Sequence, residues 1–357
     1  MPDVRLRRIK LKEKDETGCG VYTIAPSFVL SYMRGYADEV ENALLLRRFG
    51  VPFWILTRIF GRNDMYWYRL ECSFGNYSIV GTTVKSADKL PKDILDDEKF
   101  TIINGKRAYI PMTGAYDCVF FAGATLAADT DSLTKAYEVF KTEAELIDPE
   151  YTPLTVNLDG WAATQNACKA IFPDIVPINC FLHAFIKIRS RCKSKPYFQQ
   201  LSSIVWHTYH APDKTSFSER IQALNEWALL NIPSGPPLEA VQKLCNREKE
   251  FLKAYDFSGA FRTSTWLDQQ MKLLNRYLFS TNYFHGHLAS MDKRVRAWAI
   301  LHNFRPFCPT SMSASKLKFI SPAHKLNQKL YHKSWLQNLL VSASLNGFRA
   351  QPKKTVG

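Results

Sequence analysis

The sequence predicts an α/β protein whose centre is a mixed β-sheet. Three strand-like runs follow one another between residues 94 and 127, and Asn104-Gly105 between the first two is typical of a tight hairpin turn. Two helical patterns then alternate with two short strand-like runs. The first of these runs, residues 154–158, ends at a carboxylate, Asp159, which is followed by Gly160. Strands joined first by hairpins and then by helices indicate a sheet with both antiparallel and parallel pairs.

The core elements are expected in the order β-β-β-α-β-α-β. The strands and helices of this series are expected at residues 94–100, 107–112, 119–127, 131–146, 154–158, 164–172 and around Cys180. Asp131 or Ser132 is expected to cap the first helix. This element order is that of a ribonuclease-H-like fold, whose catalytic core we assign to residues 93–190 and 259–300.

A helical module is expected before this core. Helical patterns at residues 41–49, 53–60 and 65–72 are separated by glycines and fit a helix-turn-helix-like DNA-binding module within residues 26–92. An ordinary helical cap on the next domain is the alternative. Residues 76–92 are expected to form a polar linker at the end of this module, and residues 1–25 a basic arm with little periodic pattern.

A helical insertion is expected inside the core. Another clear helix pattern starts at Thr263 or Ser264 and continues to Phe279. The chain between Asp159 and this helix is longer than the fold needs. Helical patterns at 198–207, 216–230 and 238–255 fill that length, so residues 191–258 are expected to form a helical insertion domain. Residues 301–357 form a basic C-terminal segment.

The distribution of charge favours a nucleic-acid partner. The chain has a formal net charge of +14, and the 65 residues after Asp292 contain twelve lysines and arginines and no acidic residue. Aromatic residues interleave with these charges, which favours a folded phosphate-binding surface over a solvated basic face or flexible tail. The residues expected to contact DNA are Arg62, Tyr66, Trp67, Arg69, Lys187, Arg189, Arg191, Arg296 and Arg305.

Three carboxylates are the candidate catalytic residues. Phosphodiester cleavage and strand transfer need metal ions held by hard oxygen ligands, with Mg²⁺ expected here and Mn²⁺ as its substitute. Asp159 is the first candidate, and Asp97 is preferred to the neighbouring Asp96 on the first strand. Asp268 lies one turn into the helix that starts near residue 264, next to its apolar stripe. Its rivals as third ligand are three of the acidic residues of the insertion, namely Glu239, Glu248 and Glu250.

Cys180 and His183 form a Cys-x-x-His pair on what is expected to be the last strand. Zinc is disfavoured because no second ligand pair stands at a suitable spacing, so both residues are expected to support the carboxylates through hydrogen bonds. His285 and His287 are expected in a loop. The scattered cysteines without a CxxC pair, and the lack of an apolar signal core, predict reduced thiols and a cytoplasmic, nucleoid-associated protein. Phosphate-binding glycine loops and hydrolase motifs are absent from the sequence.

Several motifs resemble those of transposases from the Mutator-like superfamily of insertion sequences. The resemblance covers residues of about 90 to 345. Members of this superfamily have a ribonuclease-H-like core with a helical insertion. They also have a C/D-x-x-H motif after the second acid, which Cys180 and His183 match. Their third acid is usually Glu, whereas the matching position here holds Asp268. The motifs that carry the resemblance are Asp97-Glu98-Lys99, 155–164, 180–183, Arg262-Thr263-Ser264, His285-Gly286, 296–299 and 303–306.

The resemblance implies a DDE/D-type DNA transposase. Such an enzyme binds terminal inverted repeats, cleaves at the element's ends and uses the freed 3′-OH to attack target DNA. It implies metal binding by Asp97, Asp159 and Asp268, double-stranded DNA as partner, no membrane, and a homo-oligomer assembled on paired ends. The alternatives are a domesticated or inactive relative that only binds DNA, and a structure-selective or RNA-directed nuclease of the same fold.

Overall fold

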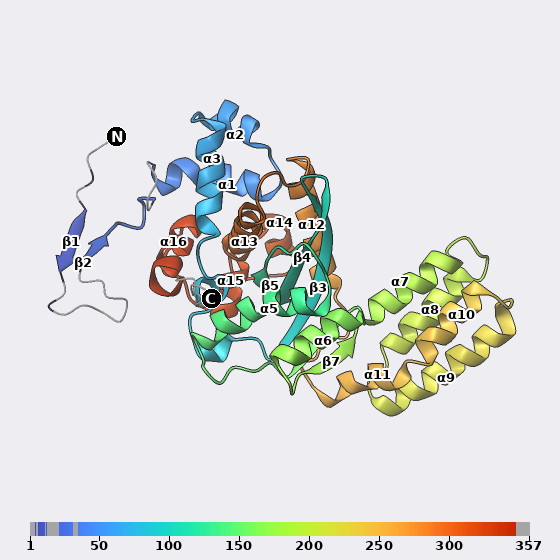
Figure 1. Cartoon of the computed structure of the whole chain (residues 1–357). Helices are drawn as coiled ribbons and strands as arrows, with labels where there is room; N and C mark the ends of the chain where they lie inside the picture. The colour runs from blue at the N-terminus through green and yellow to red at the C-terminus, as the bar shows by residue number, and fades with distance from the viewer. Residues whose placement is uncertain (1–3, 5, 11, 13–20, 31–34, 348–357) are drawn as a thin grey trace.

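The computed structural model describes residues 4, 6–10, 12, 21–30 and 35–347 (Figure 1). Its centre is a five-stranded sheet with the order β5-β4-β3-β6-β7. The strands are β3 (Asp93–Ile103), β4 (Lys106–Ala115), β5 (Cys118–Ala122), β6 (Thr155–Leu158) and β7 (Val176–Asn179). Strands β3, β4 and β5 pair antiparallel, whereas β6 pairs parallel to both β3 and β7. The predicted α/β class and mixed sheet are confirmed.

Helices make up most of the remaining chain. Those before and within the core are α1 (Ala37–Arg48), α2 (Phe53–Phe60), α3 (Asp64–Phe74), α4 (Ile79–Thr83), η1 (Ala87–Lys89), α5 (Thr130–Glu145) and α6 (Ala162–Ile171). Those that follow the sheet are α7 (Phe181–Cys192), α8 (Phe198–Tyr209), α9 (Lys214–Asn231), α10 (Pro236–Cys245), α11 (Glu248–Leu252), η2 (Lys253–Asp256), α12 (Thr265–Phe279), α13 (Leu288–Phe304), α14 (Pro309–Ala314), α15 (Pro322–Asn327) and α16 (Trp335–Asn346).

The hairpin between β3 and β4 confirms the turn that the sequence predicts. Asn104 and Gly105 have φ values of 49° and 75°, and Ile103 pairs with Lys106 across the turn. Positive φ at both central residues is the geometry of the two-residue turn that matches the strand twist, and asparagine and glycine adopt it most readily. The turn fixes the register of β4 on β3.

Helices cover both faces of the sheet. Successive residues of β3 point to opposite faces, so Ile94 packs with α5 and α6, whereas Leu95 packs with α12 and α13. Helix α5 starts at Thr130, and its cap is Asp129 instead of the predicted Asp131 or Ser132, because the Asp129 side chain accepts the capping hydrogen bond from the Ser132 backbone N–H. Two separate apolar cores, one on each face, hold the sheet between two helical layers.

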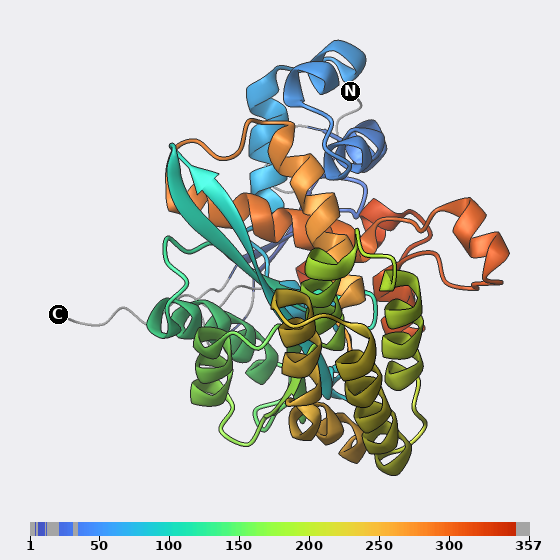
Figure 2. The same ribbon diagram turned by 90° about the vertical axis from the view of Figure 1, so that its right-hand side faces the viewer.

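The helical insertion starts earlier than predicted. Strand β7 ends at Asn179, and Cys180 is the N-cap of α7, so the prediction of a strand at residues 180–183 is wrong. The buried residues of α7 recur at helical rather than alternating spacing, because they pack into the insertion's own core; they are Phe181, Ala184, Phe185, Ile188 and Cys192. Helices α7 to α11 form a lobe that projects from one end of the sheet (Figures 1 and 2).

The N-terminal helices share a core with α12 and α13. The three predicted helices are present as α1, α2 and α3, and α2 has the predicted bounds. The stretch predicted as a polar linker instead contains α4, whose residues are all buried because it lies between α13, α16 and β5. In the predicted basic arm, β1 (Arg7–Lys10) and β2 (Val21–Ile24) pair antiparallel; residues 1–3, 5, 11 and 13–20 lie outside the described residues.

The basic C-terminal segment supplies core residues as well as surface. Phe304 and Trp335 of this segment, and Trp298 just before it, lie among the positive charges in the sequence and are buried in the core shared with α1 and α3. Helix α16 packs against α4 and α1, so the C-terminal part of the chain returns to the N-terminal helices. These three aromatic residues therefore belong to the packed core. Residues 348–357 lie outside the described residues.

A buried carboxylate joins four helices. Glu71 on α3 accepts hydrogen bonds from Arg47 on α1 (2.9 Å) and from the Tyr277 hydroxyl on α12 (3.0 Å), and Arg294 on α13 lies 3.4 Å from it. All four side chains are buried. Burying a charge is costly unless opposite charges and hydrogen bonds compensate for it. This cluster therefore fixes how α12 packs against the N-terminal helices.

We predict that Glu71→Gln strongly destabilises the protein. The substitution leaves two buried guanidinium groups without their counter-charge, which costs about 3–5 kcal/mol. Urea denaturation followed by circular dichroism measures the change. The control is Glu39→Gln, because Glu39 pairs with Arg62 on the surface, where such a pair contributes about 0–1 kcal/mol. Equal midpoints for the two variants would contradict the assigned role of Glu71.

His302 on α13 is a buried neutral histidine. Its Nδ1 lies 2.9 Å from Arg48 Nη2 and its Nε2 lies 3.0 Å from the Asp117 carbonyl oxygen. Burial lowers the pKa of His302 well below its usual value, and the nearby charges of Arg48 and Arg305 lower it further. The ring thus accepts a hydrogen bond from Arg48 and donates one to Asp117, an arrangement that protonation would break.

We predict that stability falls with pH below about 6.5 because of His302. There the unfolded chain binds a proton at this residue and the folded chain does not, so unfolding becomes easier by up to about 1.4 kcal/mol per pH unit. Denaturation midpoints at pH 7.5, 6.5 and 5.5 test this. His302→Asn should flatten the dependence, and an unchanged slope in that variant would rule out His302 as its source.

Candidate metal centre

Asp97 and Asp159 come from neighbouring parallel strands. In the register of β3 and β6, Leu95 lies opposite Asn157, and each aspartate follows two residues farther along its strand. Side chains alternate along a strand, so Asp97 shares the face of Leu95, which α12 covers. Asp159 lies one residue beyond the end of β6. Strand pairing therefore brings both residues to the same part of the sheet.

Asp96, the alternative to Asp97, lies on the opposite face. It is 3% exposed, and it accepts hydrogen bonds from Thr113 Oγ1 (2.6 Å) and Cys168 Sγ (3.2 Å). Burial raises the pKa of Asp96 to about 6, although these two hydrogen bonds oppose the shift. Asp96 therefore belongs to the packing between β3 and α6, and Asp97 is the residue that faces α12.

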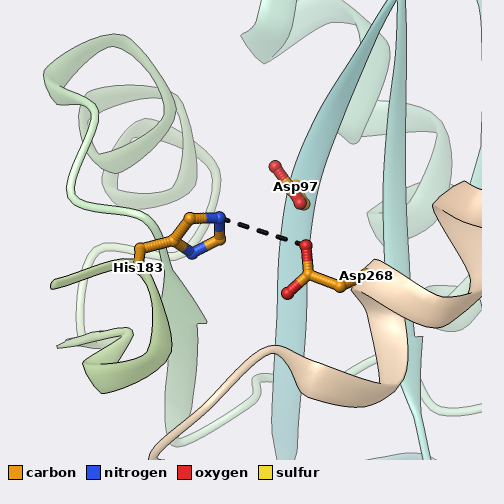
Figure 3. A group of neighbouring side chains, drawn as sticks. All are labelled: Asp97, His183 and Asp268. Atoms are coloured by element: carbon orange, nitrogen blue, oxygen red, sulfur yellow. Dashed lines mark ion pairs between the residues drawn. The ribbon is translucent and has the colours of Figure 1, made fainter. Parts of the chain in front are cut away.

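Asp268 and His183 complete a group of three potential ligands. Asp268 lies in the first turn of α12, and His183 lies in the first turn of α7. The third member is Asp97. One carboxylate oxygen of Asp97, one of Asp268 and one ring nitrogen of His183 lie within 4.8 Å of one another. Figure 3 shows these side chains pointing toward one another, with His183 Nε2 4.0 Å from Asp268 Oδ1. Within the described residues, no other three His, Cys, Asp or Glu side chains gather this closely.

Ser264 holds the supporting hydrogen bonds of this group. Its hydroxyl donates to Asp268 Oδ2 (3.0 Å), and its backbone N–H donates to Cys180 Sγ (3.2 Å). Its Oγ also lies 3.5 Å from His183 Nδ1. Ser264 is buried, so it links the start of α12 to the start of α7. The sequence marks Ser264 only as a possible helix start and as part of the Arg262-Thr263-Ser264 motif, whereas the structure shows that it contacts Asp268, Cys180 and His183.

The charges within the group act on one another. Burial raises the pKa of Asp97 to about 6; His183 lowers it, while Asp268 and Asp159 raise it. The hydrogen bond with Cys180 raises the pKa of His183 to about 9, against the effect of burial. A protonated His183 offsets the negative charge of the aspartates, and it has to release this proton before its Nε2 can bind a cation.

Asp159 lies at the edge of the group. Its Oδ1 accepts a hydrogen bond from the Trp161 backbone N–H (2.7 Å), and its charge is close enough to affect Asp97. The next residue, Gly160, has a φ of 88°, which turns the chain sharply after β6. The structure thus brings Asp97 and Asp268 together with His183, and it places Asp159 beside them.

The donor set fits a hard divalent cation. Carboxylate oxygens, which the two aspartates supply, suit Mg²⁺ and Mn²⁺, whereas the imidazole nitrogen of His183 is a ligand typical of transition metals. Cys180 is buried and its Sγ accepts a hydrogen bond from the Ser264 backbone N–H. It therefore helps to position Ser264, which in turn contacts Asp268 and His183. The sequence predicts a strand at residues 180–183 and therefore does not place His183 next to the aspartates. His183 reaches them because α7 starts at Phe181 and carries it in its first turn.

The rival acids of the insertion have other surroundings. Glu250 is bonded to Arg247 Nε (2.7 Å) and to the Asn179 side chain. Glu239 lies on α10 and Glu248 at the start of α11, and neither belongs to the group around Asp268. Asp268 is therefore the acid of this part of the chain that approaches Asp97.

Two of the nine residues predicted to contact DNA are buried. Trp67 is 2% exposed and donates to the Gly61 carbonyl (3.0 Å), and Arg296 is 0% exposed and pairs with Glu143, so both predictions are wrong. Each lies on the buried side of its helix. An aromatic or basic residue type alone therefore did not indicate exposure to a DNA partner. Tyr66 and Arg305 are half-buried, and the exposed members are Arg62, Arg69, Lys187, Arg189 and Arg191.

No family model matches the chain, and a search of curated proteins finds no significant match either. Among the described residues, every helix is too short or too polar to cross a lipid bilayer. His285 and His287 lie in the loop between α12 and α13, as predicted.

We predict that Asp97 and Asp268 are required for binding Mn²⁺. Replacing either with Asn removes an anionic ligand, so the affinity should fall by at least about 10–100-fold. Isothermal titration calorimetry with Mn²⁺ measures this loss. Glu250→Gln is the control, because it removes a rival carboxylate of the insertion. Full binding by Asp268→Asn together with loss in Glu250→Gln would transfer the site to Glu250.

Proposed function

We propose that the protein is a DNA transposase that cleaves element ends in a metal-dependent reaction and joins the 3′-OH to target DNA. The observation that carries this proposal is the convergence of Asp97, Asp268 and His183, with Asp159 beside them, from four separate elements. Clustered carboxylates on a sheet and a following helix are what metal-dependent phosphodiester chemistry requires.

The arrangement of the sheet supports a ribonuclease-H-like core. Strand β3 lies between β4 and β6, two antiparallel strands lie on one side of it, and two parallel strands lie on the other. A helical lobe enters between β7 and α12, and the Mutator-like transposases that the sequence resembles also have a helical insertion in their core. The acids from β3, β6 and α12 follow the order of a DDE/D enzyme, with Asp268 in the third position.

Each residue has a task in the proposed site. Bound Mg²⁺ or Mn²⁺ would activate the attacking oxygen and stabilise the leaving oxygen of the scissile phosphodiester. Asp97 and Asp268 supply anionic oxygens, and Asp159 adds negative charge at the edge of the group. His183 offers a nitrogen ligand, or a proton at Nε2 when it is charged. Ser264 and Cys180 keep Asp268 and His183 in place through their hydrogen bonds.

The surface supports a DNA partner. Exposed positive side chains lie on the N-terminal helices and on the insertion, and the chain carries a net charge of +14. Phosphate binding by lysine and arginine is the general source of affinity for DNA. We propose terminal inverted repeats and target DNA as substrates, a homo-oligomer on paired ends, and a nucleoid-associated location in the cytoplasm.

A DNA-binding relative without cleavage activity is the second candidate. One observation favours it: Asp159 lies outside the close group and its Oδ1 is engaged by the Trp161 N–H. In this alternative the basic surface binds DNA, and the acids serve only the fold.

We predict that the wild type nicks a labelled duplex from the element's end when Mg²⁺ or Mn²⁺ is present. Asp97→Asn and Asp159→Asn should each lose about 100-fold or more of this activity and still bind the duplex. Gel assays with EDTA controls measure cleavage, and Asp174→Asn, at an exposed loop position, is the matched control. Binding without cleavage by the wild type would select the inactive relative, and equal cleavage by all variants would place the active site elsewhere.

A further inference from the structure

A groove of about 480 Å³ lies between α7 and α10 of the insertion. Four basic side chains line it, Lys187 and Arg191 from α7 and Lys243 and Arg247 from α10 and the turn after it, against one carboxylate, Glu239. Among the described residues, Lys187, Arg191 and Lys243 form no ion pair. With three exposed cations that have no ion-pair partner and one carboxylate, the groove carries a net positive charge.

Helix α7 connects the groove to the candidate metal centre, because it carries His183 in its first turn and groove residues farther along. His183 lies in the first turn of α7, and Lys187 and Arg191 follow at four-residue intervals on the same side of the helix. Each interval advances about 6 Å along the axis at about 1.5 Å per residue. The positive charges therefore lead away from the acids in regular steps.

The opposite wall of the groove reaches the Asp159 loop. A Cβ atom added to Gly160 would lie 2.7 Å from Arg247 Nη2, so Arg247 packs directly against the residue after Asp159. Arg247 is held there by Glu250, whose carboxylate also contacts Asn179 at the end of β7. Both walls of the groove thus end beside the carboxylates.

We propose that this groove binds the phosphodiester backbone of the DNA strand that enters the metal centre. A row of cations ending at a group of acids suits a polyanion whose one phosphate reacts and whose neighbouring phosphates are held. The inference rests on the proposed function in taking DNA as the source of these phosphates. It adds Lys243 and Arg247 to the DNA-contacting residues and separates Lys187 and Arg191 from Arg189, which does not line the groove.

The test compares two variants with the same loss of charge. The groove variant is Lys187→Ala, Arg191→Ala and Lys243→Ala, and the control is Lys193→Ala, Lys195→Ala and Lys249→Ala, whose residues are exposed and lie outside the groove. Arg247 is left intact because it packs against Gly160. Circular dichroism and thermal melting establish that both variants fold.

Binding is measured by fluorescence anisotropy on a labelled 30-base-pair duplex, its single strand and an RNA of the same sequence, in EDTA at several salt concentrations. We expect the groove variant to bind DNA about 10-fold more weakly than the control, with a salt slope reduced by about 2–3. Equal DNA affinities of the two variants would overturn the proposal, and so would a loss confined to RNA.

The EDTA in this assay separates the groove from the chemistry. A selective loss of DNA binding in the groove variant supports the groove even when the wild type cleaves nothing, in which case only the proposed function fails. Cleavage by the wild type together with equal affinities of the two variants overturns the groove and leaves the proposed function intact.

Discussion

The buried carboxylate of Glu71 is the contact on which the position of α12 depends. It is bonded to Arg47 of α1 and Tyr277 of α12 and lies beside Arg294 of α13, with all four side chains removed from solvent. Because separating a buried charge from its partners costs about 3–5 kcal/mol, this cluster favours the observed packing of the four helices. Helix α12 carries Asp268 near its other end, so the N-terminal helices help to set the place of the third acid.

The candidate metal centre is assembled where two structural units meet. The sheet supplies Asp97 and Asp159, whereas α12 supplies Asp268 and the first turn of the insertion supplies His183. Ser264 binds the last two elements to each other through Asp268 and Cys180. The insertion is therefore part of the site, and its basic groove starts at the same helix that carries His183. In our proposal α7 therefore takes part both in the chemistry, through His183, and in binding the DNA strand, through Lys187 and Arg191.

Much of the fold could be predicted because its signals are local. Asn104-Gly105 specifies a turn of positive φ, and the period of apolar residues separates strands from helices in the core. The errors arose where burial is decided by distant partners. Residues 79–83 look like a linker but are covered by α13, α16 and β5, and Arg296 looks like a surface cation but pairs with Glu143. Residue type alone does not reveal such partners.

The sequence by itself determined the α/β class, the order of the core strands and helices, and the candidate acids Asp97, Asp159 and Asp268. Only the tertiary structure decided that Asp97 rather than Asp96 faces α12, because a strand sends neighbouring side chains to opposite faces and packing chooses between them. It also decided that His183 approaches Asp268 directly, since 85 residues separate them along the chain and only the return of the insertion to α12 brings them together.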